Sequence, residues 1–185
     1  MLAPRLVFTA ILTTTLLGCN EAELQREVNK AVIRQWVKTL NENEPDSLDT
    51  FVVEGFVRHS QATPDVEVNS LKDFKRFDRE TREIFPDYQT TLEQLVAEGD
   101  LVAFWGTFSG TQEGPMGAWP ATGESVELDM SGIFRLEEGK IAELWITWDN
   151  LSGLTQLGLV PELPVPAPSD SAMSEPEPES ADTAS

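Results

Sequence analysis

The feature that most constrains the fold is a series of apolar segments in the second half of the chain, separated by turn sequences. Residues 96–105, 132–135 and 139–149 are rich in β-branched and aromatic side chains, which favour strands. Turn-forming tripeptides interrupt this region: Glu98-Gly99-Asp100, Thr122-Gly123-Glu124 and Glu138-Gly139-Lys140. Such punctuation is typical of neighbouring antiparallel strands, so the pattern predicts a β-meander.

Helical patterns precede these strands. Apolar residues within 21–40 recur at intervals of three and four, as on one face of an amphipathic helix. A second helical segment begins after Ser70, a good capping residue, and ends before Pro86. Between the helices, a short strand ends at His59, and residues 60–69 form a polar loop that we expect over the mouth of the sheet. Helices followed by a meander predict an α+β domain with a curved sheet wrapped around helices.

The N-terminal segment has the character of an export signal. Residues 6–17 are apolar, too short for a membrane-spanning helix of about 20 residues but typical of a signal peptide. The sequence Leu16-Leu17-Gly18-Cys19 follows and resembles the bacterial lipobox, in which cleavage leaves an acylated cysteine. An ordinary signal peptide, or a buried or free cysteine, is the alternative. Cys19 is the only cysteine, so an intrachain disulfide is excluded.

These patterns divide the chain into four parts. We expect a lipoprotein signal peptide over residues 1–18, a tether over 19–27, one domain over 28–159 and a disordered tail over 160–185. The tail combines prolines and acidic residues with no basic or aromatic residue, a composition that disfavours a packed core.

The lipobox-like sequence also predicts where the protein resides. A lipid on Cys19 would anchor the mature chain in a bacterial membrane, facing the periplasm. Asn20 follows the cysteine, in place of the aspartate linked with retention in the inner membrane. We therefore expect the outer membrane.

The charge balance restricts the partners. The chain carries 13 Lys and Arg against 32 Asp and Glu, a net charge of −19. Such a surface repels phosphate backbones and anionic lipid headgroups, so we expect no nucleic-acid partner and no basic patch for membrane binding.

Several short motifs, in order along the chain, resemble the SnoaL-like polyketide cyclase (ester cyclase) family. They are Phe85-Pro86-Asp87-Tyr88, residues 96–100, Gly110-Thr111, Pro120-Ala121-Thr122-Gly123, Ile133-Phe134-Arg135, Gly139-Lys140-Ile141, Glu143-Leu144-Trp145 and Gln156-Leu157-Gly158. The resemblance covers residues 28–159. It implies the cone-shaped α+β fold of the nuclear transport factor 2-like superfamily, shared with ketosteroid isomerase and scytalone dehydratase.

The candidate chemistry is proton transfer by Asp149. The sequence has one histidine and no Cys/His cluster or Gly-rich phosphate loop, so no metal site is expected. The resemblance implies that Asp149, four residues after Trp145, is a general acid and base in ring closure, without metal or organic cofactor. Burial beside Trp145 would keep a usable proton near neutral pH. Alternatively, Asp149 caps a final helix over residues 150–157.

His59 is the second catalytic candidate. An imidazole that faces the cavity would hold a substrate carbonyl or tune the aspartate; a strand-end histidine satisfied by backbone is the alternative. The family pattern has histidine at two positions where this chain has Gln112 and Leu144, which weakens the enzyme prediction. Gln112 can still donate a hydrogen bond to a ligand.

Alternation along the last strand separates two faces. We assign the face with Glu143, Trp145, Thr147 and Asp149 to a cavity, because it mixes polar and aromatic residues. Arg135 and Glu143 are expected to pair across adjacent strands. The residues expected to line a ligand pocket are Gln112, Trp145, Trp105, Trp119 and Phe134.

Three functions fit this prediction. The first is an isomerase, lyase or cyclase acting by acid and base on a small hydrophobic carbonyl compound. The second is a non-catalytic periplasmic protein that binds hydrophobic small molecules. The third is a structural lipoprotein with a vestigial pocket, which forms a homodimer through the outer sheet face. Asp149 favours the first, and the missing histidines favour the others.

Overall fold

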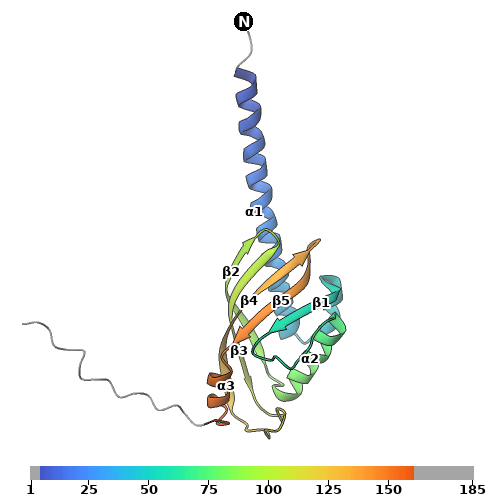
Figure 1. Ribbon diagram of the computed structural model, residues 1–185, viewed down its shortest axis with the longest axis vertical. Helices are drawn as coiled ribbons and strands as arrows, with labels where there is room; N and C mark the ends of the chain where they lie inside the picture. The colour runs from blue at the N-terminus through green and yellow to red at the C-terminus, as the bar shows by residue number, and fades with distance from the viewer. Residues whose placement is uncertain (1–4, 161–185) are drawn as a thin grey trace, which may run out of the picture.

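The computed structural model describes the backbone of residues 5–160 and the side chains of residues 21–160. The predicted tail therefore lies outside the described residues except for Val160, as does the side chain of Cys19. A single helix, α1 (Arg5–Asn41), runs through the expected signal, tether and domain start (Figure 1). Among the helices of the described part, none is both long and apolar enough to cross a membrane.

The elements follow the predicted order, in which helices precede the meander and a short helix follows it. After α1 come η1 (Pro45–Thr50), β1 (Val52–Ser60), α2 (Leu71–Ile84), β2 (Gln89–Glu98), β3 (Leu101–Thr111), β4 (Ser125–Glu137), β5 (Lys140–Trp148) and α3 (Asn150–Gln156).

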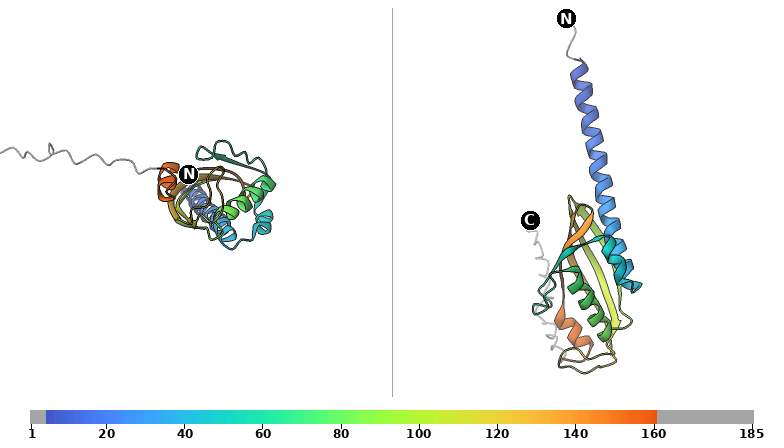
Figure 2. Two further views of the ribbon diagram at one scale, coloured as in Figure 1. Left: turned by 90° about the horizontal axis from the view of Figure 1, so that it is seen from below. Right: turned by 90° about the vertical axis from the view of Figure 1, so that its right-hand side faces the viewer.

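The strands form one curved, open sheet in the order β1-β5-β4-β3-β2. Strands β2 to β5 pair antiparallel in sequence order, which confirms the predicted meander. β1 joins the far edge by pairing in parallel with β5. The sheet wraps around α2 and the C-terminal part of α1 (Figure 2), so the predicted α+β cone is confirmed.

Backbone conformation explains the tight turn between β4 and β5. Glu138 and Gly139 have φ values of 50° and 79°. Positive φ at both central residues is the signature of a type I′ hairpin turn, whose twist matches that of the flanking strands. Glycine adopts this conformation without steric cost, and the pair Glu137 and Lys140 closes the hairpin.

An aromatic cluster fills the concave side of the sheet. Trp36 of α1 lies with its ring centroid 4.5 Å from that of Phe74 in α2 and 5.7 Å from that of Phe134 in β4. Phe56 of β1 is 0% exposed and contacts both Trp36 and Phe74. Each buried side chain of this size contributes about 1.5–3 kcal/mol of transfer free energy.

A buried polar cluster attaches α2 to its neighbours. The Tyr88 hydroxyl donates a hydrogen bond to Asp78, and Arg82 Nη2 donates to the Tyr88 hydroxyl at 2.9 Å. Arg82 also donates to the carbonyl of Leu40 at the end of α1. Burial, followed by the charge of Asp78, raises the pKa of Tyr88. At the start of α2, Ser70 accepts a hydrogen bond from the Asp73 amide, which confirms the predicted cap.

Gly132 of β4 provides a test of the sheet packing. A Cβ atom there would lie 2.2 Å from the Trp145 carbonyl oxygen and 2.7 Å from the Phe104 ring. We expect Gly132→Ala to lower the free energy of unfolding by about 1–3 kcal/mol through overpacking, measured by denaturant unfolding. Gly55→Ala is the matched control, because nothing lies within 4 Å of its added Cβ. Equal stability of the two variants would contradict this packing.

Candidate functional site

The two faces of β5 are the reverse of the assignment made from the sequence. Leu144 is 3% exposed and lies in the core, with Ile146 and Trp148 packed against that core. Trp145, in contrast, is 39% exposed. Alternation identifies the two faces of a strand, but only tertiary packing decides which one the helices cover. The prediction that the Trp145 face lines an internal cavity is therefore wrong.

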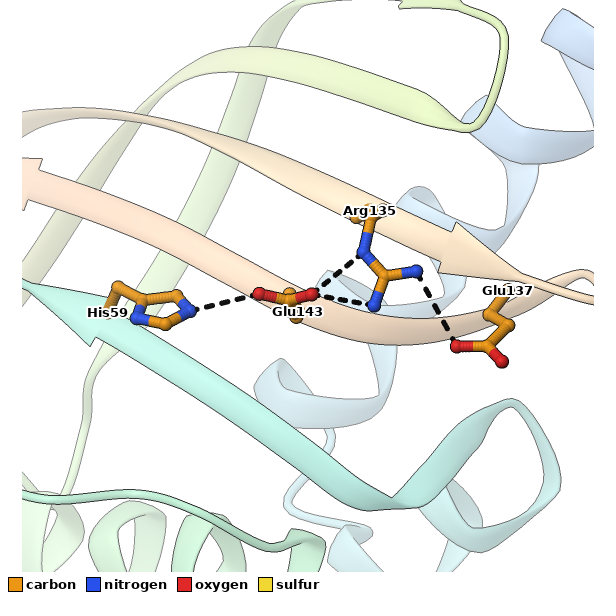
Figure 3. Close-up of polar contacts among 4 residues, drawn as sticks. All are labelled: His59, Arg135, Glu137 and Glu143. Atoms are coloured by element: carbon orange, nitrogen blue, oxygen red, sulfur yellow. Dashed lines mark hydrogen bonds and ion pairs between the residues drawn. The ribbon is translucent and has the colours of Figure 1, made fainter.

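His59 also lies on the outer surface of the sheet, not in the interior. Its Nε2 lies 3.1 Å from Glu143 Oε2 (Figure 3). Its ring also stacks on Trp145, with centroids 4.9 Å apart and planes at 13°. Phe56 and Arg58 occupy the inward positions of β1, so strand alternation turns His59 outward. His59 therefore contacts the Glu143 carboxylate and the Trp145 indole ring. From the sequence we expected it to contact a ligand or backbone groups.

The expected pair between Arg135 and Glu143 is confirmed. Arg135 donates to Glu143 Oε1 from Nε at 2.8 Å and from Nη2 at 2.6 Å. Its Nη1 lies 3.5 Å from Glu137 Oε2 (Figure 3). Hydrogen bonds from Arg135, and then from His59, hold the pKa of Glu143 below its ordinary value. These residues therefore form a connected chain of polar contacts on the outer face.

Asp149 is the N-cap of α3. Its Oδ1 accepts hydrogen bonds from the backbone amides of Leu151 at 2.9 Å and Ser152 at 3.1 Å. The residue is exposed, so the expected burial beside Trp145 is wrong and the capping alternative is confirmed. In the described part of the chain Oδ2 makes no hydrogen bond. The catalytic role of Asp149 stays a prediction.

Gln112 is fully buried and bonded within its own loop. Its Nε2 donates to the carbonyls of Gly114 and Pro120, both at 3.2 Å. Its Oε1 accepts a hydrogen bond from the Thr122 hydroxyl at 2.8 Å. The amide therefore stabilises the loop over residues 112–124, and both of its ends already have partners.

The remaining aromatic candidates lie apart from one another. Trp105 is 48% exposed on β3, Trp119 is 41% exposed in the loop before β4, and Phe134 is 2% exposed in the core. The structure thus brings His59 and Trp145 together but distributes the other predicted site residues over separate elements and faces. Their role in ligand binding stays a prediction.

Arg58, the neighbour of His59, is a candidate site residue that the sequence motifs did not indicate. Arg58 is 6% exposed, and its guanidinium carbon lies 4.5 Å from the ring centroid of Phe77 and 5.7 Å from that of Trp148. Its Nη1 donates to the Thr63 hydroxyl at 3.0 Å. Burial lowers the pKa of Arg58 to about 10. The available signal was the spacing of Arg58 from the apolar Phe56, which puts both on one face of β1.

Two surface depressions lie elsewhere. One of about 330 Å³ adjoins Asp87 and Thr111, and one of about 410 Å³ adjoins Asn43 and Arg82. Neither is lined by Asp149 or Arg58. Over the described residues, no group of three or more His, Cys, Asp or Glu side chains is arranged to hold a metal ion.

Comparison with known proteins identifies the family. Residues 30–157 match the sequence profile described as SnoaL-like polyketide cyclase. The chain belongs to this family. Among curated proteins, none matches it.

Solved structures agree with this SnoaL-like domain. TsrD from Streptomyces laurentii is 29% identical with a TM-score of 0.65, over 73% of this chain and 98% of that one. AclR from Streptomyces galilaeus is 26% identical with a TM-score of 0.65, over 75% and 90%. A SnoaL-like polyketide cyclase from Agrobacterium tumefaciens shares the fold at 21% identity, with a TM-score of 0.60 over 70% and 98%.

Proposed function

We propose that this chain is an envelope lipoprotein whose SnoaL-like domain binds a small hydrophobic carbonyl compound and moves a proton on it. Family membership supports acid and base chemistry of the cyclase or isomerase type. The observation that carries the proposal is the state of Asp149 at the end of β5. One carboxylate oxygen accepts the two capping bonds, and the other has no hydrogen-bond partner in the described chain.

The free oxygen of Asp149 is suited to act as a base. It would take a proton from the carbon next to the carbonyl, and the bonding electrons would move onto the carbonyl oxygen to give an enolate. Return of the proton at another carbon gives an isomer of the substrate, which is an isomerase reaction. Attack of the enolate carbon on a second carbonyl closes a ring, which is a cyclase reaction. Each route needs a donor or a cation at the oxygen where charge develops.

The outer sheet face favours a second candidate, a lipoprotein that pairs with another copy of itself. The strand register aligns Val96, Ala103, Ile133, Trp145 and His59 in one row across the five strands. Val96 is 65% exposed and Ile133 is 41% exposed. Single exposed apolar residues are ordinary, but a continuous row on one face is characteristic of an interaction surface. Two copies related by a twofold axis would cover it.

The site of attachment in this proposal is an acylated Cys19 in the outer membrane. Support comes from the sequence, in which Leu16-Leu17-Gly18-Cys19 ends the apolar run and Asn20 follows. Several acyl chains would hold the protein stably, since each buried CH₂ contributes about 0.8 kcal/mol.

Proton exchange on a model ketone tests the role of Asp149. The wild-type protein should accelerate deuterium uptake at the α-carbon of 2-tetralone in D₂O, followed by NMR. Asp149→Asn should reduce this rate roughly 10²–10⁴-fold, because the amide cannot act as a base. The melting temperature should change little, since asparagine also caps helices.

Asp129→Asn is the matched control for this experiment. Asp129 is exposed on β4, and its substitution should leave the exchange rate unchanged. Undiminished exchange in Asp149→Asn would remove Asp149 as the base. A large fall in its melting temperature would identify the aspartate as structural.

Substitution of Cys19 tests the anchor. The wild-type chain should fractionate with the outer membrane, and Cys19→Ala should lose the acyl chains and leave the membrane fraction. Membrane association that is the same in both proteins would refute the lipid anchor.

Substitution of Trp145 tests self-association. Trp145→Glu places a charge in this row, between Ile133 and His59, and should shift the protein from dimer to monomer in sedimentation velocity. Trp119→Glu is the control, because this exposed residue lies in the loop before β4. A wild-type chain that sediments as a monomer at all concentrations would exclude the dimer.

A further inference from the structure

Arg58 differs from the other arginines of the interior and the sheet. Arg82 lies 3.3 Å from Asp78, and Arg135 lies 2.6 Å from Glu143. Arg58 makes no ion pair within the described residues, although the chain has 32 acidic residues. The lack of an ion pair at Arg58 is therefore not explained by a shortage of carboxylates in the chain.

Burial of this unpaired charge costs free energy. The guanidinium loses most of its hydration, and among the described residues no carboxylate pairs with it to offset the loss. Desolvation is also the cause of the lowered pKa of Arg58. Proteins retain such costs mainly where the group has a task, as at binding and catalytic sites.

The contacts of Arg58 leave most of its hydrogen-bonding capacity unused. Phe77 and Trp148 lie within cation–π distance of the guanidinium, and such contacts favour the charge without accepting its edge N–H bonds. A guanidinium has five N–H donors, and the Thr63 hydroxyl is the one side-chain acceptor found for them in the described part. The remaining donors are available to a planar anionic group.

Ser60 supplies a second, independent observation. It lies two residues after Arg58 on the same face of β1, about 7 Å further along the strand. Its hydroxyl is buried and, among the described residues, has no hydrogen-bond partner. Buried hydroxyl groups are normally bonded, so Ser60 lacks an expected polar partner on the same strand face as Arg58.

The loop over residues 61–69 lies against Arg58. It is held by the Arg58 bond to Thr63, by a backbone bridge between Arg58 and Val68, and by Asn150 Nδ2, which donates to the Ala62 carbonyl at 2.6 Å. Most of its other side chains are exposed. Asn150 begins α3, directly after Asp149, so this loop connects the region of Arg58 with the end of β5.

We propose that Arg58 and Ser60 bind the anionic oxygen of a flat hydrophobic ligand, either a carboxylate or the enolate oxygen of a carbonyl compound. The ligand oxygen accepts hydrogen bonds from the guanidinium donors that Thr63 leaves free, while Phe77 and Trp148 hold the guanidinium in place. This inference rests on the proposed function for the reacting carbonyl and names the class of ligand that the interior recognises.

Binding of 2-naphthoate and of its uncharged methyl ester to the full-length protein tests this inference. Isothermal titration calorimetry should give at least a tenfold tighter binding of the acid by the wild-type protein. Arg58→Met should remove this preference, and Ser60→Ala should reduce it. Arg135→Gln is the matched control on the outer face and should keep it. The acid should also raise the melting temperature of the wild type more than that of Arg58→Met.

Arg58→Lys keeps the charge but not the planar fork, and serves if the methionine variant does not fold. It should retain part of the preference for the acid. A preference for the acid that Arg58→Met or Arg58→Lys leaves unchanged would overturn the inference.

The outcomes separate this inference from the proposed function. Equal affinity of the wild type for acid and ester would overturn the role of Arg58 but leave the binding of hydrophobic carbonyl compounds intact. If the wild type binds neither the acid nor the ester, the inference is also overturned. An Arg58-dependent preference for the acid, together with ketone exchange that does not require Asp149, would retain the inference and refute the proposed base.

Discussion

The packing of Trp36 against the concave sheet is the contact on which the rest of the structure depends. This ring meets Phe56, Phe74 and Phe134 from β1, α2 and β4. Once these positions point inward, alternation determines which face the neighbouring residues of the same strands occupy. The cluster therefore also decides which polar residues are internal, because Arg58 follows the phase of Phe56 while His59 takes the opposite one.

Local signals in the sequence predicted the local structure well. The meander, the Ser70 cap and the alternative of a cap at Asp149 follow from residue types within a few positions of one another, and each is present. The pair of Arg135 and Glu143 was also predictable, since neighbouring strands of a hairpin have a defined register. The inward face of β5 and the parallel pairing of β1 were not, because both depend on contacts between distant segments.

The same limit explains why the candidate site was only partly predicted. Asp149 and His59 were selected by residue type and by position relative to a family pattern, and both have roles in the structure, as a helix cap and as a partner of Glu143. Arg58 carries no motif. Its spacing from Phe56 indicates an inward face, but the missing ion pair appears only in the structure, because pairing depends on residues distant in the sequence.

The burial of Arg58 makes ligand binding in the proposed site depend on the conformation of the loop over residues 61–69. Arg58 is only 6% exposed and is bonded to Thr63, so a ligand would reach the guanidinium when the loop over residues 61–69 moves aside. The apparent affinity then equals the intrinsic affinity multiplied by the fraction of molecules in which this loop is open. The Asn150 bond to Ala62 favours the closed state and adjoins the Asp149 cap. Loop opening would thus loosen the start of α3, so ligand entry and the position of the proposed base would be coupled through one short segment.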